Sequence, residues 1–150
     1  MSLSSLKIRS ASGWTMFVFG VMAFVFGVVG LVTPETFLSL LGFEIVERSQ
    51  RLAGDYTLTF MAASSMASFN IGVYYVLAAL NDLKQFYLWT VPFRAVTFTV
   101  FTMLVLTGFA PARFVSVGAW ELTGAIATGL ALYFERKNVR QGGRDALEMD

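Results

Sequence analysis

The sequence contains neither cysteine nor histidine among its 150 residues. Without these two residues a chain forms no disulfide and supplies no thiolate nucleophile, iron–sulfur ligand, imidazole-ligated haem or ordinary zinc site. Charged residues are also scarce, at 14% of the chain compared with about 25% in soluble domains. The formal net charge of +1 gives no strong attraction to nucleic acid. We therefore expect a non-catalytic protein with no metal, no cofactor and no nucleic-acid partner.

Apolar residues dominate instead, at 56% of the chain with a mean hydropathy of +0.65. They form four runs, and a helix of about 20 residues is enough to cross a hydrocarbon core of roughly 30 Å. Strands of a membrane barrel alternate strictly, whereas these runs are continuous apart from the locally strand-like "TFTVFT". The sequence therefore predicts membrane helices at residues 14–33, 53–80, 87–109 and 113–134.

The fold class that follows is all-α, a four-transmembrane-helix up-down bundle over residues 14–134 with a short outer interfacial helix. Two connections are too short to allow anything but antiparallel neighbours, namely residues 81–86 and 110–113. Residues 1–13 and 135–150 are expected to be tails, the second of them mobile after its first turn.

Orientation follows from the lysines and arginines near the ends of the spans. They place both termini on the cytoplasmic side of the membrane. The side that carries both termini has the larger set, Lys7, Arg9, Lys84, Arg136, Lys137, Arg140 and Arg144, whereas the other side has Arg48, Arg51 and Arg113.

The short outer helix is predicted over residues 33–42, "TPETFLSLLG". Thr33 is a suitable N-cap, Pro34 suits the first helical position and Gly42 suits a helix end. We expect this helix to lie flat on the outer interface. Its apolar face consists of Phe37, Leu38 and Leu41.

The following residues 43–52 place Glu44 four positions before Arg48 and Glu47 four positions before Arg51. This is the favourable order of an acid–base pair on a helix, so we expect the second membrane helix to begin outside the bilayer. Asp55 follows Arg51 at the same spacing, and this pair is expected to be structural at the outer interface.

Glu121 is an acid inside the fourth run, eight residues after Arg113 and so about 12 Å below the outer surface. A charge at that depth is costly, so the side chain should face protein rather than lipid. The same helical face carries Gly124, Ala125 and Thr128, which allow another helix to approach closely. Two interpretations remain open: a protonated or paired carboxyl that locks helices together, or a proton-linked or ligand-binding acid.

Arg94 lies inside the third run, about 10 Å from its cytoplasmic end at 1.5 Å per residue. Its long side chain can reach the headgroups over that distance. Pro92 also suggests that the regular helix starts late, which would bring Arg94 nearer the boundary. The alternative is a pair between Arg94 and Asn70, which falls at a similar depth on the second run.

The second run carries the most polar residues, which recur at helical spacing along one stripe. The stripe would either line a water-filled cleft or pack against another helix. Its members are Asp55, Thr59, Ala63, Met66, Asn70 and Tyr74. Ala63 and Ala67 form a small-residue pair that predicts helix packing.

Four segments carry a family resemblance: "FGVVGLVTPETFLSLLGF" at the end of the first span, "RLAG" opening the second, an arginine entering the third, and "GFAPARFVSVGAWELTGA" leading into the fourth. On these segments the sequence resembles the DoxX-like group of small bacterial four-helix membrane proteins, over about residues 14–134. Some relatives are associated with quinone-linked or redox complexes. Since cysteine and histidine are absent here, the resemblance implies that any redox centre would belong to a partner. It also implies that the bundle lies in the inner (plasma) membrane of a bacterial cell, with both termini in the cytoplasm.

Two functions fit these observations. The first is a non-catalytic accessory subunit, or a partner that binds lipid or another hydrophobic ligand, in contact with membrane lipid and with other subunits or further copies of itself. The second is a small proton-coupled transporter that uses Glu121. A lipid-modifying enzyme is less suitable, because Asp55 and Glu121 differ in depth by about 9 Å. The candidate intramembrane polar, ligand or proton site is therefore Glu121, Asp55, Asn70 and Arg94.

Overall fold

The structure is a computed structural model that describes the backbone of residues 7–147 and the side chains of residues 7–141. Residues 1–6 and 148–150 of the two predicted tails, and the side chain of Arg144, lie outside this part. The described backbone is helical, with no strand between residues 7 and 147. Its elements are α1 (Ala11–Val32), α2 (Pro34–Leu40), η2 (Arg48–Gln50), α3 (Thr57–Leu80), α4 (Lys84–Leu106), η3 (Ala112–Phe114) and α5 (Val115–Leu147).

Four of these helices are long and apolar enough to cross a membrane: α1, α3, α4 and the part of α5 up to Gln141. The predicted all-α class with four candidate membrane helices and one short additional helix is therefore confirmed. The locally strand-like "TFTVFT" lies within α4.

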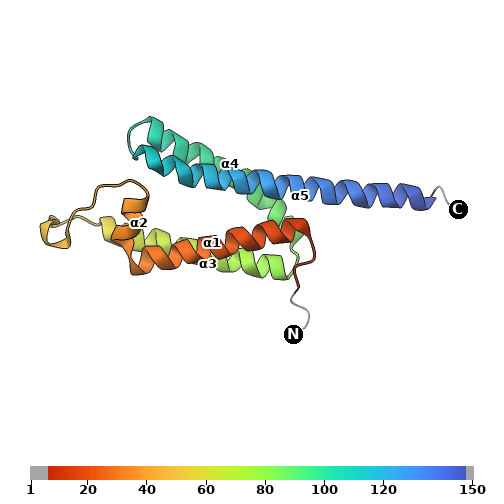
Figure 1. Ribbon diagram of the computed structural model, residues 1–150, viewed down its shortest axis with the longest axis horizontal. Helices are drawn as coiled ribbons and strands as arrows, with labels where there is room; N and C mark the ends of the chain where they lie inside the picture. The colour runs from red at the N-terminus through yellow and green to blue at the C-terminus, as the bar shows by residue number, and fades with distance from the viewer. Residues whose placement is uncertain (1–6, 148–150) are drawn as a thin grey trace.

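The four long helices form two antiparallel pairs, α1 with α3 and α4 with α5 (Figure 1). The pairs contact each other mainly through α1 and α5. They meet where α1 begins and α3 passes into α4, which we call the closed end, and they diverge toward α2, which we call the open end (Figure 1). Although a turn of only residues 81–83 joins α3 to α4, these two helices share no extended contact. The bundle is therefore open along the side between α3 and α4.

Glycines allow the backbones of α1 and α3 to touch. A Cβ atom on Gly27 would lie 2.6 Å from the backbone nitrogen of Phe69, and one on Gly72 would overlap the backbone nitrogen of Phe24. The Ser68 hydroxyl donates a hydrogen bond of 2.9 Å to the carbonyl oxygen of Ala23 across the same contact. Close approach of this kind is how membrane helices associate when hydrophobic burial gives them no driving force.

A polar cluster around Glu135 of α5 joins the helices at the closed end. The Glu135 carboxylate accepts hydrogen bonds from the backbone nitrogen (2.8 Å) and hydroxyl (2.9 Å) of Ser12. The Lys84 ammonium, at the start of α4, lies 2.5 Å from the same carboxylate. Next to it, the Ser10 hydroxyl donates to Asp82 in the turn between α3 and α4 (2.8 Å). These charge-assisted bonds tie the start of α1, the start of α4 and α5 together.

Two predicted segments differ from the structure. Residues 43–52 are not a helix: the chain is irregular apart from η2, and α3 begins only at Thr57. Glu44 and Glu47 therefore do not form the expected pairs with Arg48 and Arg51, because a Gly42 with φ of +88° ends α2 and leads the chain away as a loop. The fourth long helix also extends beyond the predicted residue 134, since α5 continues to Leu147. The reason is that adding a residue to an existing helix costs far less than starting a helix.

The glycine contact gives a matched pair of variants in the two helix pairs. Gly72→Ala places a methyl group against the Phe24 backbone, whereas the Cβ of Gly129→Ala would lie an acceptable 3.7 Å from Val91. We expect Gly72→Ala to lower the free energy of unfolding by about 1–3 kcal/mol through overpacking. Gly129→Ala should be neutral or should raise it by about 0.5–1 kcal/mol. Denaturation in detergent monitored by circular dichroism measures both, and equal effects would contradict a backbone contact at Gly72.

Candidate functional site

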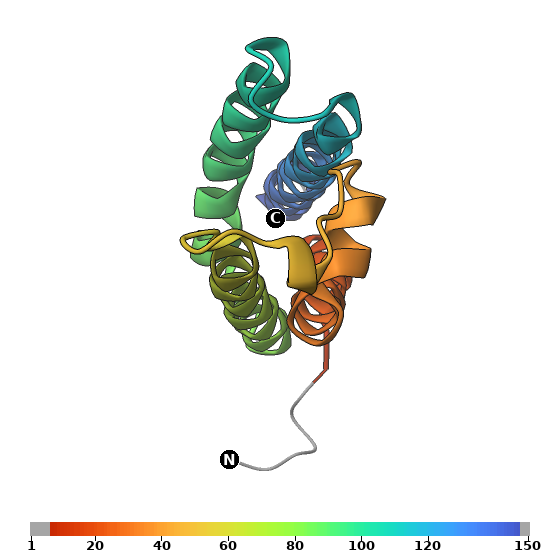
Figure 2. The same ribbon diagram turned by 90° about the vertical axis from the view of Figure 1, so that its left-hand side faces the viewer.

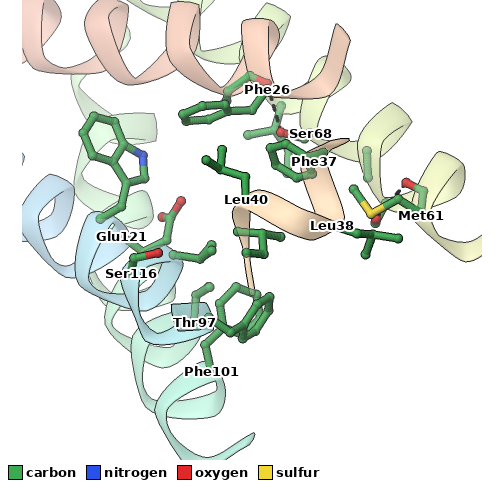
Figure 3. Close-up of a pocket in the computed structure, with 18 of the residues that line it drawn as sticks. Phe26, Phe37, Leu38, Leu40, Met61, Ser68, Thr97, Phe101, Ser116 and Glu121 are labelled. Atoms are coloured by element: carbon green, nitrogen blue, oxygen red, sulfur yellow. Dashed lines mark hydrogen bonds between the residues drawn. The ribbon is translucent and has the colours of Figure 1, made fainter. Parts of the chain in front are cut away.

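A cleft of about 1010 Å³ separates the two helix pairs (Figure 3). Its wall is predominantly apolar and comes from all five α-helices. Phe60 of α3 and Phe93 of α4 line it and are 73% and 71% exposed, so the cleft is open along the side where α3 and α4 separate. In a membrane, this opening would face the acyl chains of the surrounding lipid.

Helix α2 covers the cleft at the open end, where it lies between the two helix pairs (Figure 2). Phe37, Leu38, Leu40 and Leu41 line the cleft, and Leu38 is only 8% exposed. Figure 3 shows Leu40 pointing from α2 into the cavity, toward the side where Glu121 projects. The helix exists as predicted, but its apolar face is turned into the cleft rather than toward lipid. The reason is that the diverging pairs leave an apolar wall that α2 covers.

Ion pairs fix the loop that follows α2. The Arg48 guanidinium lies 2.7 Å from the Glu35 carboxylate, and its hydrogen bond lowers the pKa of Glu35. Asp55 accepts hydrogen bonds from the backbone nitrogen (2.9 Å) and hydroxyl (2.5 Å) of Thr57, which lower the pKa of Asp55 and start α3. Arg51 lies 2.7 Å from the same carboxylate, so the predicted pair of Arg51 and Asp55 is present. Asp55 belongs to the loop and does not line the cleft.

Arg94 and Glu121 come together on the wall of the cleft. The Arg94 Nε atom, on α4, lies 3.6 Å from Glu121 Oε2, on α5. The Arg94 side chain is 3% exposed and its guanidinium lies over the rings of Phe19 (4.5 Å) and Tyr75 (4.9 Å). Both sequence-based interpretations of Arg94 are therefore wrong, since it neither reaches the headgroups nor pairs with Asn70. Pro92 lies inside α4 rather than before it, which places Arg94 well within the helix.

Gly124 makes room for this pair. A Cβ at position 124 would overlap Nη1 of Arg94 and would lie 2.7 Å from the ring of Phe19. The other small residues of the same face, Ala125 and Thr128, are buried, and the Thr128 hydroxyl lies 3.0 Å from that of Thr15 on α1. The stripe that begins at Gly124 thus lies at the junction between α5 and α1.

The Arg94–Glu121 pair is neutral as a whole, but its hydrogen bonding is incomplete. Nε and Nη1 of Arg94 are buried without a hydrogen-bond partner in residues 7–141. The Glu121 side chain is 27% exposed, and Figure 3 shows its carboxylate projecting into the cavity. The Glu121 carboxylate is therefore a hydrogen-bond acceptor that faces the cleft, and the buried Arg94 guanidinium balances its charge. The same described residues contain no group of three side chains suited to hold a metal ion.

Two other expectations on α3 fail. Thr59, Ala63, Met66 and Tyr74 of the predicted polar stripe are exposed on the outside of the bundle, and Asn70 is half-buried outside the cleft. Ala67 is also exposed and lines the cleft instead of packing against a helix. The cleft wall is instead the neighbouring face of α3, which consists of Phe60, Ser64, Ala67, Ser68 and Ile71. The three- and four-residue spacing of its small residues Ser64, Ala67 and Ser68 could have indicated this face.

A double-mutant cycle tests the energetic coupling of Arg94 and Glu121. Glu121→Gln leaves Arg94 without its counter-charge, so we expect the free energy of unfolding to fall by about 2 kcal/mol. Arg94→Met should lower it by a similar amount. The double variant should be more stable than the sum of the two losses predicts, by about 1 kcal/mol. Additive losses in detergent denaturation would show that the two charges do not interact.

Acidification should loosen the loop at residues 44–56. The pKa values of the Glu35 and Asp55 carboxyls are lowered from their ordinary values of 4.5 and 3.8. The stability that the two ionised carboxylates give to the loop is therefore complete above the ordinary pKa values. It is lost as the pH falls through the lowered pKa values. Hydrogen–deuterium exchange of this loop, corrected for intrinsic rates, should increase at about pH 3 relative to about pH 6. Glu35→Gln removes one of the two titrating groups and should weaken the dependence. Equal protection at both pH values in the unmodified protein would contradict the prediction.

Comparison of the sequence with protein-family models, with curated proteins and with solved structures found no match. The resemblance to the DoxX-like group therefore stays a prediction, and the site has to be interpreted from its own geometry.

Proposed function

We propose that this protein is a non-catalytic integral membrane protein that holds a lipid or another hydrophobic ligand between its two helix pairs. The observation that carries the proposal is the apolar cleft of about 1010 Å³, open between α3 and α4. Small-molecule sites typically have volumes of about 300–1,000 Å³ and are mostly apolar with a few polar groups. The cleft is at the upper end of that range, and its charged lining residues are Arg94 and Glu121.

The position of the opening supports a ligand that comes from the membrane. A hydrophobic molecule would enter sideways between α3 and α4 without crossing water. Aromatic rings line the path, including Phe60, Phe93 and Phe101. At the open end, α2 reduces direct access from solvent, because Leu40 and Leu41 stand in the cleft.

We further propose that the protein acts as an accessory subunit of a larger membrane complex in the inner membrane of a bacterium. The described chain begins at the closed end, and α5 runs past that end toward its last described residue (Figure 1). Basic residues lie in this part of the chain, because Lys84 pairs with Glu135 at the closed end and Arg136 and Lys137 follow Glu135 on α5. Basic residues mark the cytoplasmic side, so the proposed orientation places the closed end in the cytoplasm. Partners in this proposal are membrane lipid together with other subunits or a second copy of the chain, in keeping with the DoxX-like resemblance.

A small proton-coupled transporter that uses Glu121 is the second candidate. It is favoured by one observation, the partial exposure of Glu121 toward a cleft that separates two helix pairs. The ion pair with Arg94 argues against it, because loss of the carboxylate charge would leave a 3% exposed guanidinium unbalanced. We therefore place ligand binding first.

Two alanines on α3 give a matched test of ligand binding in the cleft. Ala67 lines the cleft, whereas Ala63, one turn away and also exposed, does not. Ala67→Phe should fill part of the cavity and reduce the hydrophobic ligand retained during gentle detergent purification by several-fold. Ala63→Phe should leave the retained amount unchanged. Native mass spectrometry followed by lipid extraction measures the ligand, and equal ligand content in both variants would contradict binding in the cleft.

A further inference from the structure

We propose that the cleft, if it holds a hydrophobic ligand as argued above, selects amphiphiles with an uncharged head group that carries a hydroxyl or an amide N–H. Glu121 accepts the hydrogen bond of that head group, and the hydrocarbon part lies along the aromatic wall. Arg94 is a positioning residue: from its buried position it balances the charge of the Glu121 carboxylate and orients it toward the cleft.

The inference begins with the balance of charge in the cleft. Arg94 and Glu121 are the charged residues among those that line it, and their formal charges cancel. A charged head group would leave the cleft with an unbalanced charge at membrane depth. The free-energy cost of such a charge is unfavourable by every method that has measured or calculated it. An uncharged head group leaves the balance intact.

Hydrogen-bonding capacity selects among uncharged head groups. Glu121 projects into the cavity and is 27% exposed, whereas the Arg94 side chain is 3% exposed and enclosed by Phe19, Tyr75 and Gly124. Of the two charged groups, the more accessible one is thus an acceptor. A hydrocarbon without a donor would cover this carboxylate and remove it from water without compensation, which is unfavourable. A hydroxyl or amide N–H supplies the missing bond.

The unsatisfied nitrogens of Arg94 support its role as a positioning residue. Nε and Nη1 make no hydrogen bond within residues 7–141, so the contacts that fix the guanidinium are the Glu121 pair and two aromatic rings. Gly124 leaves room for it against α5. A side chain this enclosed serves to set the charge and direction of Glu121 rather than to receive the ligand itself.

Trp120 provides a probe inside the cleft. It lines the cavity and its ring lies 4.2 Å from that of Phe19. Trp14 and Trp89, which are 54% and 57% exposed, do not line it, so replacing both by phenylalanine leaves Trp120 as the one tryptophan. Bromine atoms on an acyl chain bound in the cleft would quench its fluorescence.

The experiment reconstitutes this single-tryptophan protein in nanodiscs that contain a small fixed fraction of a dibromostearoyl lipid. The probes are the uncharged monoglyceride, an anionic sulfate ester that stays ionised, and a cationic trimethylammonium analogue. A dibrominated phosphatidylcholine at the same bromine content gives the background from bulk lipid. We expect quenching by the monoglyceride to reach half-saturation at a concentration about tenfold lower than that of either charged probe, the ratio expected for one hydrogen bond to a charged group.

Charge variants should invert this selectivity. Glu121→Gln leaves the positive charge of Arg94 unbalanced, so the anionic probe should become the strongest quencher. Arg94→Met leaves the carboxylate unbalanced and should favour the cationic probe. The double variant restores neutrality and should return to the uncharged probe with weaker binding, which keeps the test valid if either single variant is unstable. Glu44→Gln, at an exposed loop position, is the matched control and should change nothing.

The outcomes separate this inference from the proposed function. If all three probes quench Trp120 above background with equal strength and the variants change nothing, the cleft binds acyl chains and head-group selection is wrong. Preference for the cationic probe in the unmodified protein also overturns the inference and favours the transporter alternative. Preference for the anionic probe overturns it as well. If no probe quenches above background, the proposed ligand cleft itself is wrong.

Discussion

The buried charge of Arg94 is the constraint on which the arrangement of this protein depends. A guanidinium that is 3% exposed on a membrane helix needs a balancing charge nearby, and Glu121 supplies it at 3.6 Å. That requirement fixes which faces of α4 and α5 meet. It also explains why position 124 is glycine, since any larger side chain would displace the guanidinium from its place beside Phe19.

The cleft follows from an uneven distribution of helix contacts. Glycines bring α1 against α3, and the cluster around Glu135 joins both pairs at the closed end. The described contacts include no comparable one between α3 and α4 toward the open end, so the pairs diverge there and α2 takes part of the space. A short helix that would otherwise bury its apolar face in the bilayer surface buries it in the protein.

The sequence alone was sufficient for features that depend on local composition. Hydropathy predicted the four long helices, Thr33 to Gly42 predicted α2, and the spacing of Arg51 and Asp55 predicted their pair. The Arg94–Glu121 pair was not predicted, because depth counted from opposite membrane surfaces separated residues that tertiary packing brings together. The wrong face of α3 was chosen for a related reason: polar residues that face outward and small residues that face the cleft share the same helical period.

The ion pair also bears on the choice between binding and transport. A proton-coupled carrier must let its carboxylate give up its charge during each cycle, and the site must tolerate that state. Here Glu121 stands against a guanidinium that Phe19, Tyr75 and Gly124 hold in place, so neutralising the acid would leave an enclosed cation without compensation. A site that stays neutral throughout is better suited to retaining an uncharged amphiphile than to exchanging protons. The same pair that closes the contact between α4 and α5 therefore favours a static role for the cleft.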